Sequence, residues 1–339
     1  MSDSDELSTL FSGVNIAIFI IAFISVALRC YVRIGITNAF GADDYWMLAT
    51  LASFTANTTV ALLSAKYGLG KHASTLSHDS VIQAKKFSYA TEITYGVTMI
   101  FAKISIALFL LRITVHRVQK WIIYIITALT CIAGLTLVFI VAFQCKPLSR
   151  AWDSDLPGSC ITVKAIPIST YTYSALAVVT DLTFTVLPLF IVWNLQMDKR
   201  TKLALVPIFS LALLASLAVV IRIPLIPEFA EPDFLYATAQ FGIWSAVEQG
   251  LAITAGSLIT TRPLLRKMFN RFSTIKIPYR YPSGGVQRNS KANSAGADHH
   301  INDRYGSWNG QDRRASDAIS LRASNSVRSP SDEVEDDHL

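Results

Sequence analysis

The sequence predicts an all-α membrane protein that folds as a seven-transmembrane-helix bundle. Of its 339 residues, 52% are hydrophobic and only 16% are charged, whereas soluble domains carry about 25% charged residues. Seven apolar stretches each have about 20 residues, the length that an α-helix needs to cross the hydrocarbon core of a bilayer. These observations disfavour a soluble enzyme, and four cysteines are too few for a secreted disulfide scaffold.

The predicted helices lie between residues 7 and 261. Residues 1–6 are acidic, whereas a signal peptide begins with basic residues, so we expect the first apolar stretch to be retained as a helix after a short extracellular N-terminus. Four of the seven stretches contain no charged residue. The seven are Leu7–Leu28, Tyr45–Ala65, Phe87–Leu111, Trp121–Phe143, Ile166–Trp193, Leu203–Ile221 and Phe234–Thr261.

The distribution of Lys and Arg predicts that the N-terminus is outside and the C-terminus cytoplasmic. Basic residues are more frequent in the first, third and fifth connections and directly after the seventh helix than in the remaining connections. Short cytoplasmic segments carry this excess in multi-pass proteins. The net charge of +6 therefore reflects membrane orientation and gives no reason to expect nucleic acid as a partner.

Two further segments follow the seventh helix. In residues 262–277, apolar residues between Leu264 and Phe272 alternate with basic ones at helical spacing, which predicts a short amphipathic helix on the inner leaflet. The alternative is a frayed end of the seventh helix. Residues 278–339 are rich in Ser, Asn, Asp, Arg and Gly and predict a disordered cytoplasmic tail. Within it, Ser316 and Ser329 are phosphorylation candidates.

Four ionisable residues lie inside the predicted helices: Glu92, Lys103, Asp181 and Glu248. Because buried charges are costly in a bilayer, we expect Lys103 to pair with Asp181, Glu248 or both. Glu92 is expected to face a wet outer vestibule. These four residues are interpreted as one layer inside the bundle. It serves either as an ion-pair latch or the floor of a ligand cavity, or as a static structural link between helices. Arg222 is assigned to the connection after the sixth helix.

Aromatic residues gather toward the outer halves of the same helices, which is typical of a small-molecule pocket. Ordinary bundle packing and interfacial belts are the alternative interpretation. The residues are Tyr89, Tyr95, Tyr171, Tyr173, Tyr236, Phe241 and Trp244.

The predicted outer connection after the fourth helix holds Cys145 and Cys160, which predict a disulfide in an oxidising compartment. No histidine lies within a predicted helix, and no nucleotide-binding loop or nucleophile elbow appears, so we expect no metal, no cofactor and no enzymatic activity. The seventh helix contains no lysine that could carry a retinal Schiff base.

Several strings stand in a characteristic order and spacing between about residues 10 and 270. They are Gly41–Trp46, Tyr67–His72, Lys103–Ile106, Phe109–Ile113, Cys145–Pro147, Trp152, Cys160, Asp181, Leu187–Pro188, Trp193, Arg222, Trp244, Glu248 and Arg262–Pro263. As a set they make the chain resemble the filamentous-fungal seven-helix rhodopsin domain family, which includes Pth-eleven-like receptors and integral membrane proteins of the satratoxin-cluster type.

The resemblance implies a receptor-like protein rather than a light-driven pump. We expect a multi-pass protein of the plasma membrane that senses an extracellular small-molecule or surface cue and acts on a cytoplasmic signalling partner. The alternative hypothesis is a transporter or accessory membrane protein of a secondary-metabolite gene cluster. The expected partners are thus the lipid bilayer, an unknown ligand and a signalling protein.

Overall fold

The computed structural model describes residues 3–153, 155–162, 165–194, 199–225 and 234–261. Seven long α-helices occupy most of this described part. They are α1 (Asp3–Tyr31), α2 (Ala42–Tyr67), α3 (His78–Ile113), α4 (Arg117–Ala142), α5 (Ala165–Asn194), α6 (Lys199–Arg222) and α7 (Phe234–Leu258). Short elements between or after them are the helical turns η1 (Val32–Ile36), η2 (Ala73–Thr75), η3 (Leu148–Ala151) and η5 (Ile259–Thr261), and the strands β1 (Cys145–Lys146) and β2 (Ser159–Cys160).

The prediction of a helical membrane protein is confirmed. Five described helices, α1 to α5, are long and apolar enough to cross a membrane, and a shorter apolar helical stretch runs over Ser210–Leu225. Large apolar side chains remain exposed along α1 and α4, including Ile20, Phe23 and Ile132. Such a surface suits contact with lipid rather than water. The number of crossings and the orientation of the chain in the membrane stay predictions.

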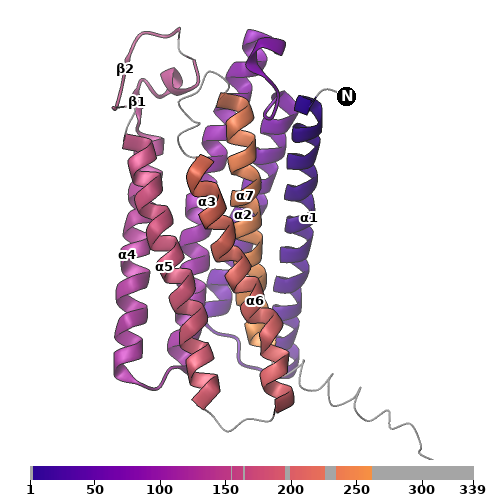
Figure 1. The fold of residues 1–339 in the computed structure, drawn as a ribbon, viewed down its shortest axis with the longest axis vertical. Helices are drawn as coiled ribbons and strands as arrows, with labels where there is room; N and C mark the ends of the chain where they lie inside the picture. The colour runs from indigo at the N-terminus through magenta and orange to yellow at the C-terminus, as the bar shows by residue number, and fades with distance from the viewer. Residues whose placement is uncertain (1–2, 154, 163–164, 195–198, 226–233, 262–339) are drawn as a thin grey trace, which may run out of the picture. The chain divides into compact units, whose positions relative to one another are not determined.

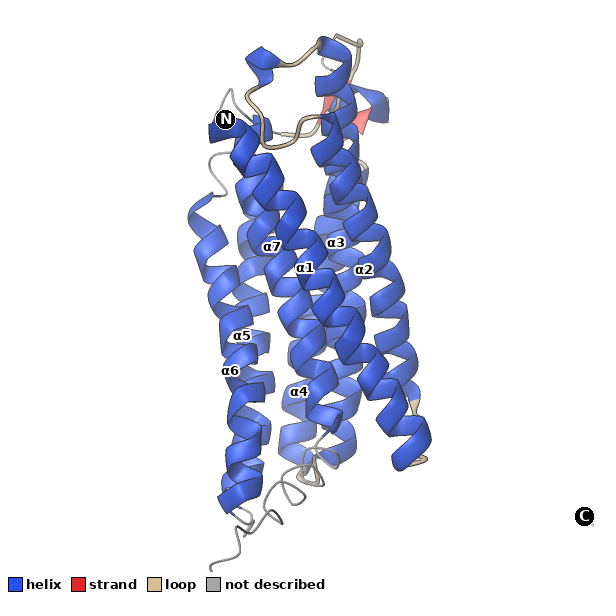
Figure 2. Ribbon diagram, turned by 90° about the vertical axis from the view of Figure 1, so that its right-hand side faces the viewer, coloured by secondary structure: helices blue, strands red, loops and turns tan. Residues whose placement is uncertain are grey.

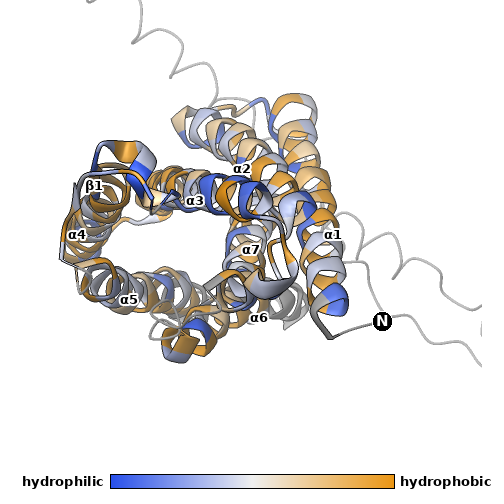
Figure 3. Cartoon of the chain, turned by 90° about the horizontal axis from the view of Figure 1, so that it is seen from above, coloured by the Kyte–Doolittle hydropathy of each residue, from blue (hydrophilic) through white to orange (hydrophobic). Residues whose placement is uncertain are grey.

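The helices follow one another around a ring, and each packs on its neighbours in the sequence (Figure 1). Helix α7 closes the ring against α1 and also contacts α2 and α3, so α3 and α7 share the interior. Figure 2 shows α1 lying across the front of α7, and Figure 3 looks down the bundle and shows the same ring order. The antiparallel strands β1 and β2 lie at the end of the bundle where α1 begins, here called the hairpin end.

Local sequence signals explain how α2 begins and ends. The backbone N–H of Gly41 donates to the Asp44 carboxylate at 3.0 Å, which caps the start of the helix. At the other end Gly68 has a φ of 117°, the left-handed conformation that glycine adopts without steric cost and that terminates helices. Two strings of the resemblance, Gly41–Trp46 and Tyr67–His72, therefore bound one helix.

Helix α3 begins nine residues before the start predicted from hydropathy, which was Phe87. Its N-cap is Ser77, whose hydroxyl accepts from the Ser80 backbone N–H. The first two turns are polar, so an apolar-run criterion misses them although the helix continues. As a consequence His78 is the first residue of α3, and the expectation that no histidine lies in a helix is wrong.

Serine and threonine hydroxyls within the helices donate to carbonyls of the preceding turn, as Thr50 does to Trp46 and Thr130 to Ile126. This pattern satisfies hydroxyl groups where no water is available. Other polar side chains link helices: the Asn57 amide of α2 donates to the Thr91 carbonyl of α3 at 2.9 Å. Polar contacts thus supplement the apolar packing between helices.

Some predictions lie outside the described residues. These are the amphipathic segment 262–277, the tail 278–339 and the two phosphorylation candidates Ser316 and Ser329.

Candidate functional site

An ion pair between Lys103 of α3 and Asp181 of α5 crosses the interior of the bundle. The Lys103 ammonium donates to the Asp181 carboxylate, and the two side chains are 2% and 13% exposed. Asp181 is one of the two partners that the sequence leaves open for Lys103. The pair joins two helices that make few other contacts with each other.

Glu248 of α7 pairs instead with Arg222, the last residue of α6, at 2.9 Å. Both side chains are buried, with exposures of 0% and 1%. The Tyr95 hydroxyl of α3 donates to the same Glu248 oxygen at 2.8 Å, and Ser245 accepts from Arg222 at 3.2 Å. The guanidinium also lies over the rings of Tyr95 and Phe241, at 5.0 and 5.3 Å from their centroids. Helices α3, α6 and α7 therefore meet at one buried charge pair.

The sequence-based assignment of Arg222 to a loop is therefore wrong, because the residue ends α6 and is buried. The residue follows an apolar run and precedes Pro224, so the sequence places it where a connection would start. Its burial depends on how α6 is rotated toward α7, which apolar periodicity alone does not reveal. The sequence signal that could have predicted this burial is Glu248, a carboxylate inside a predicted helix that needs a cation as its partner.

Two pockets adjoin this charge pair. The α1–α2 pocket has about 500 Å³ of empty space between α1, α2, α3 and α7, and polar groups of Asn15, Asn57 and Gln249 line it. The α4–α5 pocket has about 440 Å³ of empty space lined by residues of α3, α4, α5, α6 and α7, among them Arg222 and Tyr173. Both pockets are lined by Glu92, Tyr95 and Phe241. Glu92 therefore stands at the boundary between two cavities.

Asp181 lines a third pocket of about 530 Å³ with apolar residues of α3, α5, α6 and α7. Lys103 and Glu248 line none of these three described pockets. Of the four predicted ionisable residues, Lys103 and Asp181 therefore pair with each other, Glu248 pairs with Arg222, and Glu92 lines two pockets.

The predicted pocket aromatics divide into two groups. Tyr95, Tyr173 and Phe241 line the pockets, and the rings of Tyr95 and Tyr173 meet edge to face at 6.4 Å. The others lie elsewhere: Tyr89 packs against Trp152, Tyr236 stacks on His72, Tyr171 is 39% exposed, and Trp244 is half-buried outside the three pockets.

A second buried charge cluster joins α1, η1 and α2 at the end of the bundle opposite the hairpin end. Arg29 donates to Asp44 at 2.7 Å and to Asp43 at 2.6 Å, and Arg33 donates to Asp43 at 2.8 Å. Arg29 also donates to the Gly256 carbonyl of α7 at 2.9 Å. Both arginines follow the first predicted helix, at the position of a loop, whereas the structure buries them against the two aspartates of the Gly41–Trp46 string.

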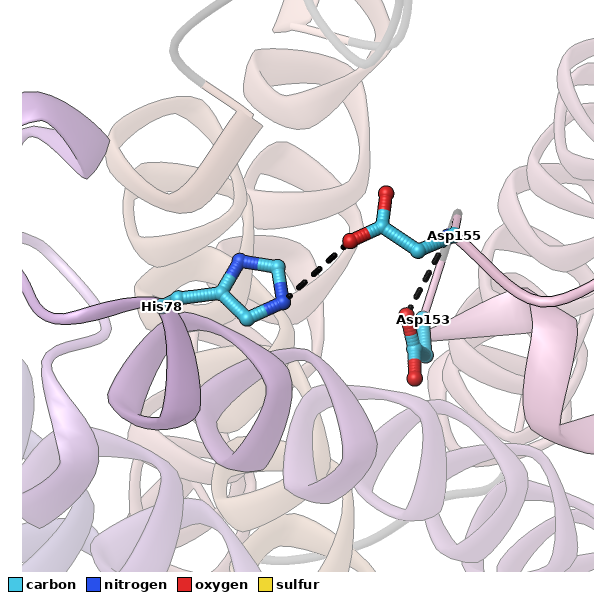
Figure 4. A group of neighbouring side chains, drawn as sticks. All are labelled: His78, Asp153 and Asp155. Carbon is cyan, nitrogen blue, oxygen red and sulfur yellow. Dashed lines mark hydrogen bonds and ion pairs between the residues drawn. The ribbon is translucent and has the colours of Figure 1, made fainter.

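At the hairpin end, the predicted disulfide between Cys145 and Cys160 is confirmed and joins β1 to β2. Near it, ligand-type atoms of His78, Asp153 and Asp155 lie within 4.8 Å of one another, a group that the sequence did not predict (Figure 4). His78 contacts the Asp155 carboxylate at 3.5 Å, and Asp153 accepts from the Asp155 backbone N–H at 3.2 Å. These contacts link α3 to the loop that contains the disulfide.

Comparison with known proteins supports the family suggested by the sequence. The family model described as the fungal rhodopsin domain matches residues 28–267. A SAT4 family membrane protein of Emericella nidulans is 32% identical over 161 residues, which are 47% of this chain and 41% of that protein. The chain thus spans less than half of that relative. No solved structure matches the chain significantly.

Two further relatives carry names that point in different directions. The polyenoic acids biosynthesis gene cluster protein Ba17b of Metarhizium anisopliae is 25% identical over 79% of this chain and 78% of its own length. The Receptor GIN3 of Arthrobotrys oligospora is 23% identical over 63% of this chain and 51% of its own length.

Proposed function

Because the chain belongs to the fungal rhodopsin domain family of multi-pass membrane proteins, we propose that it is a receptor-like protein of the plasma membrane that senses an extracellular small-molecule or surface cue. In this proposal the N-terminus is outside and the cytoplasmic face reads out the signal. A relative named as a receptor supports the proposal.

The observation that carries the proposal is the contact between pocket and charge network. Tyr95 lines both the α1–α2 and the α4–α5 pocket, and its hydroxyl binds Glu248, which pairs with Arg222. A ligand that displaces the Tyr95 ring would alter a buried hydrogen bond in which α3, α6 and α7 meet. Buried pairs of this kind have discrete arrangements, so a small shift at the pocket transmits to whole helices.

The second ion pair extends the same path. Lys103 lies two turns of α3 beyond Tyr95 and binds Asp181 of α5. Movement of α3 relative to α5 and α6 therefore perturbs both pairs together. We assign the readout to the connections on the face opposite the hairpin end and to a cytoplasmic signalling partner.

Photochemistry and enzymatic activity are not part of this proposal. Helix α7 contains no lysine in its sequence, and the buried amine of Lys103 is engaged with Asp181. The residues around the pockets include no paired nucleophile and base of the kind that hydrolases use.

A second candidate function is a transport or accessory role in a secondary-metabolite gene cluster. It is favoured by relatives named as biosynthesis cluster proteins, among them the fugralins biosynthesis cluster protein 2 of Gibberella zeae, which is 23% identical over 81% of this chain.

One experiment separates the two candidates. Fungal cells with and without the protein are exposed to conditioned culture medium, and cytosolic calcium and cAMP are recorded alongside efflux of the metabolites. A receptor produces a protein-dependent calcium or cAMP change with unchanged efflux. Protein-dependent efflux without such a change rejects the receptor proposal. An N-terminal epitope tag that antibody reaches only after permeabilisation rejects the proposed orientation.

A further inference from the structure

Arg222 presents one edge of its guanidinium without a partner. Its Nη1 group binds Glu248 and Ser245, whereas Nε and Nη2 are buried and have no hydrogen-bond acceptor among the described residues. Nε–H and one terminal N–H lie parallel on the same edge of a guanidinium and form a two-donor fork. A buried donor without an acceptor destabilises the protein, and a charged donor does so more strongly.

Arg29 shows that burial alone does not produce such an edge. It is as buried as Arg222, with 1% exposure, yet all three of its nitrogen groups are bound: Nε to Asp44, Nη1 to Gly256 and Nη2 to Asp43. The fork of Arg29 is thus filled by carboxylates of the protein. The equivalent fork of Arg222 has no such partner, and Arg222 lines the α4–α5 pocket, so an oxygen of a molecule bound there is the candidate acceptor.

The charges around the pocket decide which oxygen fits. Glu248 already neutralises Arg222, and Lys103 and Asp181 neutralise each other. Glu92 lines the same pocket, and in the described part of the chain no ion pair joins it to a cation. An ionised acid would therefore add negative charge to a site that already holds one excess carboxylate, and uncompensated buried charge is strongly unfavourable. A carbonyl oxygen accepts both N–H groups with its two lone pairs and adds no charge.

The remaining wall of the pocket suits an apolar body. Leu137, Val138 and Val141 of α4 and Ile166 of α5 line it, together with the rings of Tyr173 and Phe241. About 440 Å³ of empty space, part of it open to solvent, lies within this lining.

We propose that the α4–α5 pocket binds an uncharged, largely apolar small molecule through a carbonyl oxygen that accepts from Nε and Nη2 of Arg222. This ligand class deepens the proposed receptor function and rests on it for its physiological meaning, but binding itself is measured without any signalling readout.

The test uses three probes that share a ten-carbon skeleton: decanamide, decanoate and decane. They are titrated calorimetrically into the full chain in lipid nanodiscs, with empty nanodiscs subtracted to remove partition into lipid. Decanamide is expected to bind at least about tenfold more tightly than decanoate or decane. One good hydrogen bond to a charged group changes a dissociation constant by about that factor. Tighter binding of decanoate, or equal binding of all three, overturns the proposal.

Three variants test the site. Arg222→Lys retains a cation for Glu248 but removes the fork, so decanamide affinity should fall about tenfold or more. Val138→Phe fills the pocket without altering a charge and should also abolish binding. Glu92→Gln removes the excess carboxylate and should increase the affinity for decanoate relative to that for decanamide. If decanamide binds both Arg222→Lys and Val138→Phe as it binds the natural protein, the site is wrong.

The outcomes remain distinct from those of the function experiment. Binding that depends on Arg222 without any cellular response rejects the receptor proposal and leaves the site in place. A cellular response of unchanged potency in Arg222→Lys rejects the site and leaves the receptor proposal in place. Absence of decanamide binding above empty nanodiscs means that the fork holds water only, and the proposal fails.

Discussion

Replacing Lys103 with methionine should destabilise the bundle strongly, because it leaves the Asp181 carboxylate without its cation. Removal of one partner from a buried ion pair typically costs 3–5 kcal/mol. Asp181 is 13% exposed, so some hydration remains and the lower part of that range is expected. A loss of about 3 kcal/mol is a large share of the 5–15 kcal/mol that stabilises a typical protein. Reduced surface expression should accompany it.

Two other substitutions at the pair have different expected costs. Asp181→Asn keeps an oxygen that accepts from Lys103, so its cost should be smaller, about 1–3 kcal/mol. The double variant Lys103→Met with Asp181→Leu removes both charges and should come close to the natural protein. Lys86→Met is the matched control, since Lys86 is an exposed lysine of the same helix and should change stability by less than about 0.5 kcal/mol.

The assay is unfolding in nanodiscs followed by intrinsic fluorescence, combined with the fraction of protein that elutes as a single species on size exclusion. Lys103→Met, Asp181→Leu and their combination form a double-mutant cycle, and Lys86→Met is its control. The ion-pair account would be falsified if the double variant lost as much stability as the two single variants added together, because their energies would then be uncoupled.

Three further predictions follow from other contacts. Arg29→Ala should cost about 3–5 kcal/mol, since it leaves two buried aspartates with Arg33 as their one remaining buried cation in the cluster. Arg112→Ala should cost less than about 1 kcal/mol because Arg112 is 48% exposed and 3.6 Å from Asp43; comparative thermal unfolding distinguishes the two variants. Tyr95→Phe should weaken the Glu248 network by about 1–3 kcal/mol, and an unchanged unfolding midpoint would contradict the hydrogen bond. Cys145→Ser should cost about 3 kcal/mol by opening a loop between residues 15 apart, and the natural protein under reducing conditions should reproduce that loss.

The helices were predictable because a bilayer imposes length and apolarity on every segment that crosses it. Each predicted stretch lies within or closely overlaps a helix in the structure. The start of α3 differs most from the prediction, because polar turns after Ser77 belong to the helix and precede the apolar run. Hydropathy reports contact with lipid, whereas hydrogen bonding and capping decide where a helix begins.

The ionisable residues within apolar runs were equally visible, since a charge there must have a reason to be buried. The pairing of each cation with a particular carboxylate was harder to predict from the sequence. Lys103 and Asp181 are 78 residues apart, and Arg222 and Glu248 meet only because the last turn of α6 faces α7. Such pairings depend on helix rotation and register, and a single sequence contains no direct measure of either.

The cluster of Arg29, Arg33, Asp43 and Asp44 was missed for a different reason. These residues flank a short connection, and charges beside a connection are usually solvated. The signal that would have found them is the balance of two arginines against two aspartates within 16 residues. Opposite charges that cancel are what burial requires.

The central claim is that a ligand in the pockets lined by Glu92 acts through the buried charge pairs. The most direct test is the dose dependence of the calcium and cAMP response to conditioned medium in cells that carry the natural protein, Glu92→Gln or the double variant Lys103→Met with Asp181→Leu, at equal surface expression. The account predicts that Glu92→Gln shifts the effective concentration and that the double variant binds its ligand but signals less. Identical dose–response curves for all three proteins would contradict it.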